Sequence, residues 1–164
     1  GRLRTRLRRW RRFARTMALL GALYAATSEA AACVAAERFR DVIGTIDGTT
    51  LDAAEASYAD VARTGPLDLG LRVLVNGRLR SHLVGLADRV IEDYRSDQPS
   101  LALTHWKQAE RALQWALRLS PGDRQAQARL QLCQAHIIRI GVRSGRSAAS
   151  QATYRRAIDR FRAA

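Results

Sequence analysis

The stretch that decides the fold is WKQAERALQWALRLSPGD, residues 106–123 of a chain of 164. Its apolar residues, Trp106 and Leu113 among them, recur every three or four positions, which is the period of an amphipathic helix. The four residues SPGD, 120–123, then supply a serine cap, a proline for the first turn and an acidic residue, which together predict that a second helix begins. The stretch therefore predicts two helices joined by a short turn.

The same helical spacing continues on both sides of this stretch. Only three prolines and eleven glycines interrupt the chain, and alanine, leucine and arginine, which favour helices, dominate it. Beyond a helix that ends at Gly44 or Gly48, helices are expected over residues 50–64, 66–95, 100–119, 121–141 and 147–163. We expect an all-α chain of antiparallel helical hairpins, with a flexible basic loop at 141–147.

The dipeptide Asn76-Gly77 allows a different structure for one segment. Asn-Gly between apolar runs is a strong signal for a β-hairpin. The run before it, LRVLV, does not alternate between apolar and polar residues, and no other segment offers a partner sheet. A long helix with a local weak point at this dipeptide is therefore the preferred interpretation, and a hairpin is the alternative.

Alignment of the prolines reveals a repeat. Ala109-x3-Leu113-x2-Ala116-x4-Pro121 resembles the second helix of a tetratricopeptide repeat, in which small residues let two helices pack closely. The intervals from Tyr58 to Leu113 and from Leu113 to Tyr154, 55 and 41 residues, exceed the standard repeat of about 34. The residues expected to pack the repeats are Ala54, Tyr58, Pro66, Ala109, Leu113, Ala116, Pro121, Tyr154 and Ala157.

The resemblance covers residues 37–164 and implies a short solenoid of stacked helix pairs. Hairpins of another alanine-rich solenoid family are the structural alternative. We expect the array to continue beyond residue 164 and the chain to be a piece of a longer protein. The resemblance also implies a concave surface, lined by the first helix of each pair, that binds a peptide or a partner helix. On the helix after residue 123, that face would present Gln125, Arg129, Leu132, His136 and Arg139.

The expected binding face has a plain alternative. Arg129 could pair with an acidic group, but Ala128 and Leu132 give it no polar companion on the same helix, so a clamp for a terminal carboxylate is not expected. Arg129 and Arg139 could equally belong to a solvated helix face.

The N-terminal region has the layout of a membrane anchor. Residues 1–16 contain eight Arg and no acidic residue, and residues 17–26, MALLGALYAA, are an apolar run. Residues 17–36 form a helix of about 30 Å, enough to cross a hydrocarbon core. Glu29 disfavours insertion of this helix into a membrane. A carboxylate near the centre of a span costs about 2.5 to 3.5 kcal/mol, whereas each leucine favours insertion by only about 0.3 to 0.6 kcal/mol.

Other interpretations of residues 17–36 stay open. They are a signal cleaved after Ala30-Ala31-Ala32 or Val34-Ala35-Ala36, and a soluble helix packed on the array. AAAC, residues 30–33, also resembles a lipoprotein processing box but lacks its leucine. We take the anchor as the expectation. The Arg-rich segment would then remain in the cytoplasm and the repeats would lie outside it, in the periplasm if the protein is bacterial, whereas a soluble helix implies a cytoplasmic protein.

The net charge of +13 suggests a second class of function. Residues 17–123 carry a slight acidic excess, whereas 124–164 carry nine Arg and only one acidic residue, Asp159. A basic module that binds nucleic acid or another anionic surface is therefore the alternative to a protein-binding scaffold. Its candidate contacts are Arg143, Arg146, Arg155, Arg156, Arg160 and Arg162. No aromatic residues interleave in the basic loop for base stacking, which makes nucleic acid the weaker expectation.

The sequence gives no support for an enzyme. It contains no zinc-protease, nucleophile-elbow, phosphate-loop or dinucleotide-binding spacing. His82, His105 and His136 fall on three separate expected helices, and Cys33 and Cys133 lack metal or redox spacing, so no metal or cofactor is expected. Trp106 and Trp115 are expected in the core. The predicted function is a non-enzymatic scaffold that binds protein.

Overall fold

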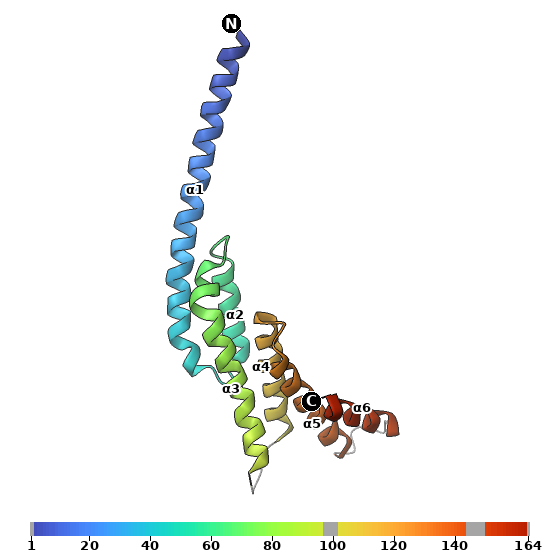
Figure 1. Ribbon diagram of the computed structural model, residues 1–164. Coiled ribbons are helices and arrows are strands. Elements are labelled where there is room, and N and C mark those ends of the chain that lie inside the picture. The colour runs from blue at the N-terminus through green and yellow to red at the C-terminus, as the bar shows by residue number, and fades with distance from the viewer. Residues whose placement is uncertain (1, 97–101, 144–149, 164) are drawn as a thin grey trace.

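The computed structural model describes residues 2–96, 102–143 and 150–163, and these residues are mostly helical with no strand among them (Figure 1). The expectation of an all-α chain with a long apolar N-terminal helix is confirmed. A 3-10 turn (Ile43–Thr45) follows the first helix, and a π-helical segment (Leu71–Val75) precedes the third. The six α-helices are α1 (Arg2–Val42), α2 (Leu51–Ala62), α3 (Asn76–Arg95), α4 (Leu103–Leu119), α5 (Arg124–Arg143) and α6 (Ser150–Ala163).

The first helix extends far beyond the rest of the molecule. Its C-terminal part packs on α2 and on the π-helical segment, while its N-terminal half projects away from the other helices (Figure 1). By length and composition, Phe13–Thr45 is long and apolar enough to cross a membrane. Only 11% of its 18-residue apolar stretch is buried. Large apolar side chains, such as Leu19, Leu23 and Tyr24, are more than 60% exposed there.

Helices that are separated by one other helix along the chain, such as α2 and α4, run parallel to each other. Arg111 and Arg118 on α4 bind Asp52 and Glu55 on α2, respectively, so residue numbers rise in the same direction along both helices. The same holds for α3 and α5, as the contacts described below show. Successive helices α2, α3 and α4 reverse direction at each turn (Figure 1).

The interior consists of two apolar clusters that share α3 and α4. The first lies among α1, α2, α3 and α4, and the second among α3, α4 and α5. An edge-to-face pair of rings links Phe39 to Tyr58, and another links Tyr58 to Trp115, each with 5.9 Å between centroids. These rings join α1, α2 and α4 into one core. Trp106 and Trp115 are both buried, as expected.

Asn76-Gly77 lies in a helix, so the preferred interpretation is confirmed and the hairpin is wrong. The π-helical segment that ends at Val75 marks the expected local weak point. The hydroxyl of Tyr58 donates a 2.9 Å hydrogen bond to Oδ1 of Asn76, which holds the asparagine in the helix. Tertiary contact therefore overrides the local turn preference.

The turns before α5 and before α3 differ in detail from the expectation. The cap of α5 is Asp123, whose Oδ1 accepts a 3.0 Å hydrogen bond from the amide of Ala126, so Ser120 and Pro121 precede the helix. Pro66 is not the first residue of a helix either, because helical backbone begins at Leu69. Before α2, Asp47 accepts hydrogen bonds from Thr49 and Thr50, which lower its pKa to about 2.

The residues expected to pack the repeats divide into three groups. Ala109, Leu113 and Ala116 are buried, and Ala54 and Tyr58 pack against the first cluster. Pro66 and Pro121 are exposed in turns rather than packed, because the prolines interrupt the chain between helices. The side chains of Tyr154 and Ala157 on α6 lie outside the described residues. So does most of the expected loop 141–147, since α5 continues to Arg143.

Candidate functional site: the groove between α3 and α5

Three polar contacts tie α5 to α3 along its length. Arg80 Nη1 lies 2.7 Å from Asp123 Oδ2, Arg129 donates two hydrogen bonds to Asp88, and Arg139 Nη1 lies 3.0 Å from Tyr94 Oη. The residue numbers rise together on the two helices, so α3 and α5 run parallel. Asp123 also caps α5, which fixes the first turn of that helix directly on α3.

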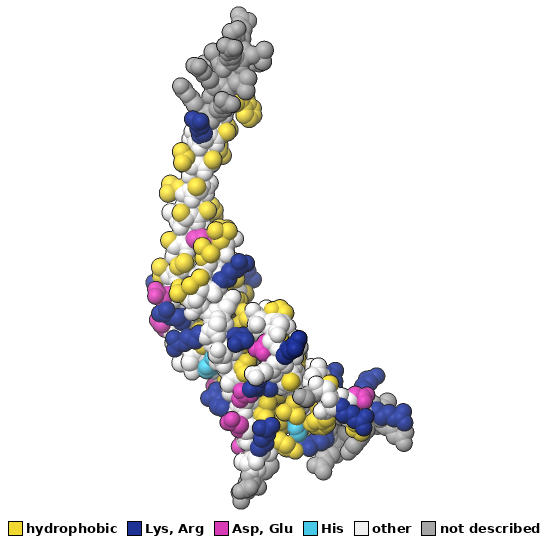
Figure 2. Space-filling model, in the orientation of Figure 1, with side chains coloured by type: hydrophobic (Ala, Val, Ile, Leu, Met, Phe, Trp, Pro, Cys, Tyr) yellow, Lys and Arg dark blue, Asp and Glu magenta, His cyan; other side chains and the backbone are white. Residues whose placement is uncertain are grey.

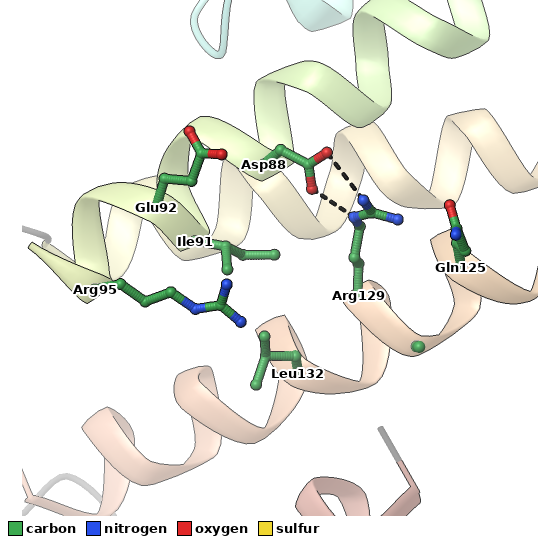
Figure 3. A pocket seen from close by; sticks show the side chains of 8 residues that line it. Asp88, Ile91, Glu92, Arg95, Gln125, Arg129 and Leu132 are labelled. Atoms are coloured by element: carbon green, nitrogen blue, oxygen red, sulfur yellow. Dashed lines mark hydrogen bonds and ion pairs between the residues drawn. The ribbon is translucent and has the colours of Figure 1, made fainter.

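A pocket of about 350 Å³ opens between the two helices, beside the Asp88–Arg129 pair (Figure 3). Its apolar wall combines Ile91 of α3 with Ala128 and Leu132 of α5. Pockets of this size accommodate a few side chains or a small ligand. We call this pocket and its rim the α3–α5 groove; its lining residues are Asp88, Ile91, Glu92, Arg95, Gln125, Ala128, Arg129 and Leu132.

The charged residues of the groove differ in their partners. The guanidinium of Arg129 is compensated by Asp88 on the opposite helix. Glu92 and Arg95 are exposed and form no ion pair with another described residue. Figure 3 shows the guanidinium of Arg95 extending toward the space between Ile91 and Leu132. A cation without an ion-pair partner among the described residues thus lies beside an apolar wall, an arrangement that suits a carboxylate next to an apolar side chain.

The structure brings together three of the five residues predicted on the binding face. Gln125, Arg129 and Leu132 line the groove, and Ala128 lies between them. Binding by these residues stays a prediction. The sequence interpretation missed the other wall, because it considered only the helix after residue 123. Asp88, Ile91, Glu92 and Arg95 recur on α3 at intervals of three, one and three residues, a pattern that places all four on neighbouring helical faces.

His136 and Arg139 do not line the groove. The ring of His136 is buried and stacks on Trp106 with 4.2 Å between centroids and 16° between planes. Burial, followed by the nearby charge of Arg139, lowers the pKa of His136 to about 4, and its Nδ1 has no hydrogen-bond partner among the described residues. Arg139 lies over the ring of Tyr94, 5.3 Å from its centroid. Both residues stabilise the second cluster.

The two cysteines lie outside the groove. Cys133 is buried, and burial together with the charge of Glu110 raises its pKa to about 12, so its thiol behaves as a small apolar group. Cys33 is half-buried. Within residues 2–96, 102–143 and 150–163, no cluster of three His, Cys, Asp or Glu side chains is placed to hold a metal ion.

The basic residues of α6 form a separate surface. Arg155, Arg156 and Arg162 are exposed, whereas Arg160 donates hydrogen bonds to Gln131 and Gln134 of α5. The side chains of Arg143 and Arg146 lie outside the described residues. No protein-family model, no curated protein and no solved structure matches this chain.

Proposed function

We propose that the chain is a membrane-anchored, non-enzymatic scaffold that binds protein in the α3–α5 groove. The observation that carries this proposal is the groove itself, with an apolar wall and with Arg95 and Glu92, which form no ion pair within the described part of the chain. The helices α2 and α4 run parallel, and so do α3 and α5, as equivalent helices do in a solenoid of stacked hairpins. This arrangement supports a tetratricopeptide-like array.

The chemistry of the groove selects a particular kind of segment. Ile91 and Leu132 favour an apolar side chain, and Arg95 favours an acidic group beside it. Arg129 contributes less to such binding, because a partner carboxylate would have to compete with Asp88 for its guanidinium. The proposed ligand is therefore a peptide or helix that places an aspartate or glutamate next to a leucine-sized residue.

The proposed anchor is the free half of α1. Its exposed leucines have no partner within the described part of the chain, and an isolated row of such side chains is unfavourable in water. The Arg-rich segment before it would remain in the cytoplasm, with α2 to α6 on the other side of the membrane. If the protein is bacterial, the groove would face the periplasm.

Capture from native membranes tests the scaffold function. The full chain, solubilised in mild detergent, serves as bait in parallel with Arg95→Glu and with Lys107→Glu, which makes the same charge change at an exposed position on α4. We expect one protein to be retained by the wild type and by Lys107→Glu and lost with Arg95→Glu. Equal retention by all three chains would contradict groove binding.

Nuclease treatment and salt distinguish the alternative, a basic module that acts through α6. A protein that contacts six or more phosphates loses on the order of 10³-fold in affinity between 50 and 200 mM salt. Binding in the groove involves one or two charges and changes much less. Material that is lost on nuclease treatment, and that requires Arg155, Arg156 and Arg162, would support the basic module instead.

A further inference from the structure

Glu29 is a buried carboxylate in the middle of the apolar part of α1. It is only 8% exposed, whereas Leu19, Leu20 and Leu23 earlier on the helix are more than half exposed. Oε1 accepts a hydrogen bond from the amide of Leu67, and Oε2 accepts one of 3.4 Å from the amide of Leu69. Both donors belong to the turn between α2 and α3, residues 63–70, which we call the α2–α3 turn.

Two glycines allow the α2–α3 turn to lie directly on α1. A Cβ atom at Gly65 would lie 2.7 Å from Cβ of Ala32 and 2.8 Å from Oε1 of Glu29. A Cβ atom at Gly70 would lie 3.0 Å from Cα of Cys33. Asp68 completes the turn in the left-handed region, with φ of 54°. The sequence is thus built to bring backbone amides to the carboxylate.

Three side chains in and just after the turn are exposed and apolar, while Arg63 at its start is exposed and forms an ion pair with Asp60. Leu67 is 57% exposed, Leu69 is 47% exposed, and Val73 in the following helical segment is 78% exposed. The turn lies at the end of the folded region from which the free half of α1 projects, the upper end of that region in Figure 1. Apolar side chains on this turn therefore continue the apolar surface of α1, which Figure 2 shows along the projecting helix.

The length of α1 shows why this continuation matters. Between Arg15 and Glu29 the helix has 13 uncharged residues, which span about 20 Å, whereas a hydrocarbon core is about 30 Å thick. If Glu29 is shielded from lipid, the stretch without other charges extends from residue 16 to residue 36 and spans about 32 Å. Only the longer stretch matches a bilayer, and it reaches the level of the α2–α3 turn.

We propose that the α2–α3 turn is a second membrane-contacting element, which shields Glu29 from lipid and places Leu67 and Leu69 in the bilayer leaflet next to the folded region. This inference rests on the proposed membrane anchoring by α1. It removes the cost of an exposed carboxylate in the span, since two backbone amides replace the water that would otherwise solvate Glu29. It also fixes the orientation of the folded region on the membrane, because two elements contact the bilayer rather than one.

Spin-label accessibility of the full chain in phosphatidylcholine–phosphatidylglycerol vesicles tests the proposal. Single cysteines are introduced by Leu67→Cys, Leu20→Cys and Ala56→Cys in a Cys33→Ala background; Cys133 is buried and stays unlabelled. Leu20 reports on the anchor, and Ala56 is an exposed position on α2 below the turn. Collisions with oxygen indicate lipid around a label, and collisions with a water-soluble nickel chelate indicate water.

The expected result is that labels at positions 20 and 67 collide with oxygen and are protected from nickel, while the label at 56 shows the reverse. A label at 67 that behaves like the one at 56, with position 20 still in lipid, would overturn the role of the turn and leave the anchor in place. Labels at both 20 and 67 in water would overturn the anchor as well. The two failures are therefore distinguishable.

Discussion

Arg129 on α5 holds Asp88 on α3 through two hydrogen bonds, Nε to Oδ1 at 2.5 Å and Nη2 to Oδ2 at 3.1 Å. This pair sets the spacing of the helices at one end of the groove. The pair also neutralises the charge of Arg129, the residue that the sequence singled out as a possible partner for an acidic ligand. Arg95, which the sequence did not single out, lies beside the apolar wall and forms no ion pair in the regions that the structure describes.

The Asp88–Arg129 pair should contribute measurably to stability. Both side chains are about two-thirds buried, and two-pronged pairs are stronger than single contacts. A double-mutant cycle with Asp88→Asn and Arg129→Gln is expected to give a coupling of about 1 kcal/mol in urea unfolding. The same cycle on the more exposed pair Asp52–Arg111 should give a few tenths of a kcal/mol. Equal couplings would show that burial adds nothing.

Gly70 and Gly77 should respond oppositely to alanine. Gly70→Ala places a methyl group 3.0 Å from the backbone of α1 at Cys33 and should destabilise the fold by about 1 to 3 kcal/mol. Gly77 lies inside α3 with nothing within 4 Å of a new Cβ, so Gly77→Ala should stabilise by about 0.5 to 1 kcal/mol. Thermal unfolding of both variants checks this. A Gly70→Ala protein as stable as the wild type would contradict the close contact between α1 and the α2–α3 turn.

Ala116 should not tolerate a larger side chain. It is fully buried in the first cluster, and Ala116→Leu should destabilise by about 1 to 3 kcal/mol because the neighbouring side chains must move. Ala53→Leu on the exposed face of α2 is the matched control and should change stability by less than about 0.5 kcal/mol. An unchanged melting temperature for Ala116→Leu would argue against close helix packing there.

Stability should fall as the pH decreases from about 6.5 to 4 because of His136. Its pKa is lowered to about 4 in the folded protein, so the unfolded chain binds a proton in this range while the folded protein does not. His136→Phe removes this proton uptake. Between pH 7 and pH 5 the wild type should therefore lose about 2 kcal/mol more stability than the variant. If the stability of the wild type and of His136→Phe changed with pH in the same way, the pKa of His136 would not be lowered in the folded protein.

The helices were predictable because apolar residues recur at helical spacing within each one and turn residues mark its ends. The apolar spacing around Trp106 and Leu113 predicts a helix with a buried face, and the break at 120–123 gives its end. The identity of the cap was missed, since serine and aspartate are both good caps and only the tertiary contact with Arg80 selects Asp123. The turn preference of Asn76-Gly77 was likewise overridden by the contact with Tyr58.

The site was predictable only in part, because it is made by two helices. The face of α5 that the tetratricopeptide resemblance implied includes Gln125, Arg129 and Leu132, and these three residues line the groove. No local signal states that α3 supplies the opposite wall. His136 was placed on the same face by spacing, yet Trp106 and Tyr94 cover it from neighbouring helices. The covering of Glu29 also depends on residues about 40 positions away, which no local pattern reveals.

Site-specific photocrosslinking in intact native membranes tests the scaffold account most directly. A photoreactive residue replaces Gln125 at the rim of the α3–α5 groove, and a second chain carries it at Lys107 on α4 as the control. The account predicts a discrete crosslinked protein from position 125 that is absent at position 107 and disappears when Arg95→Glu is added. No crosslink at 125, or the same products from both positions, would contradict binding in the groove.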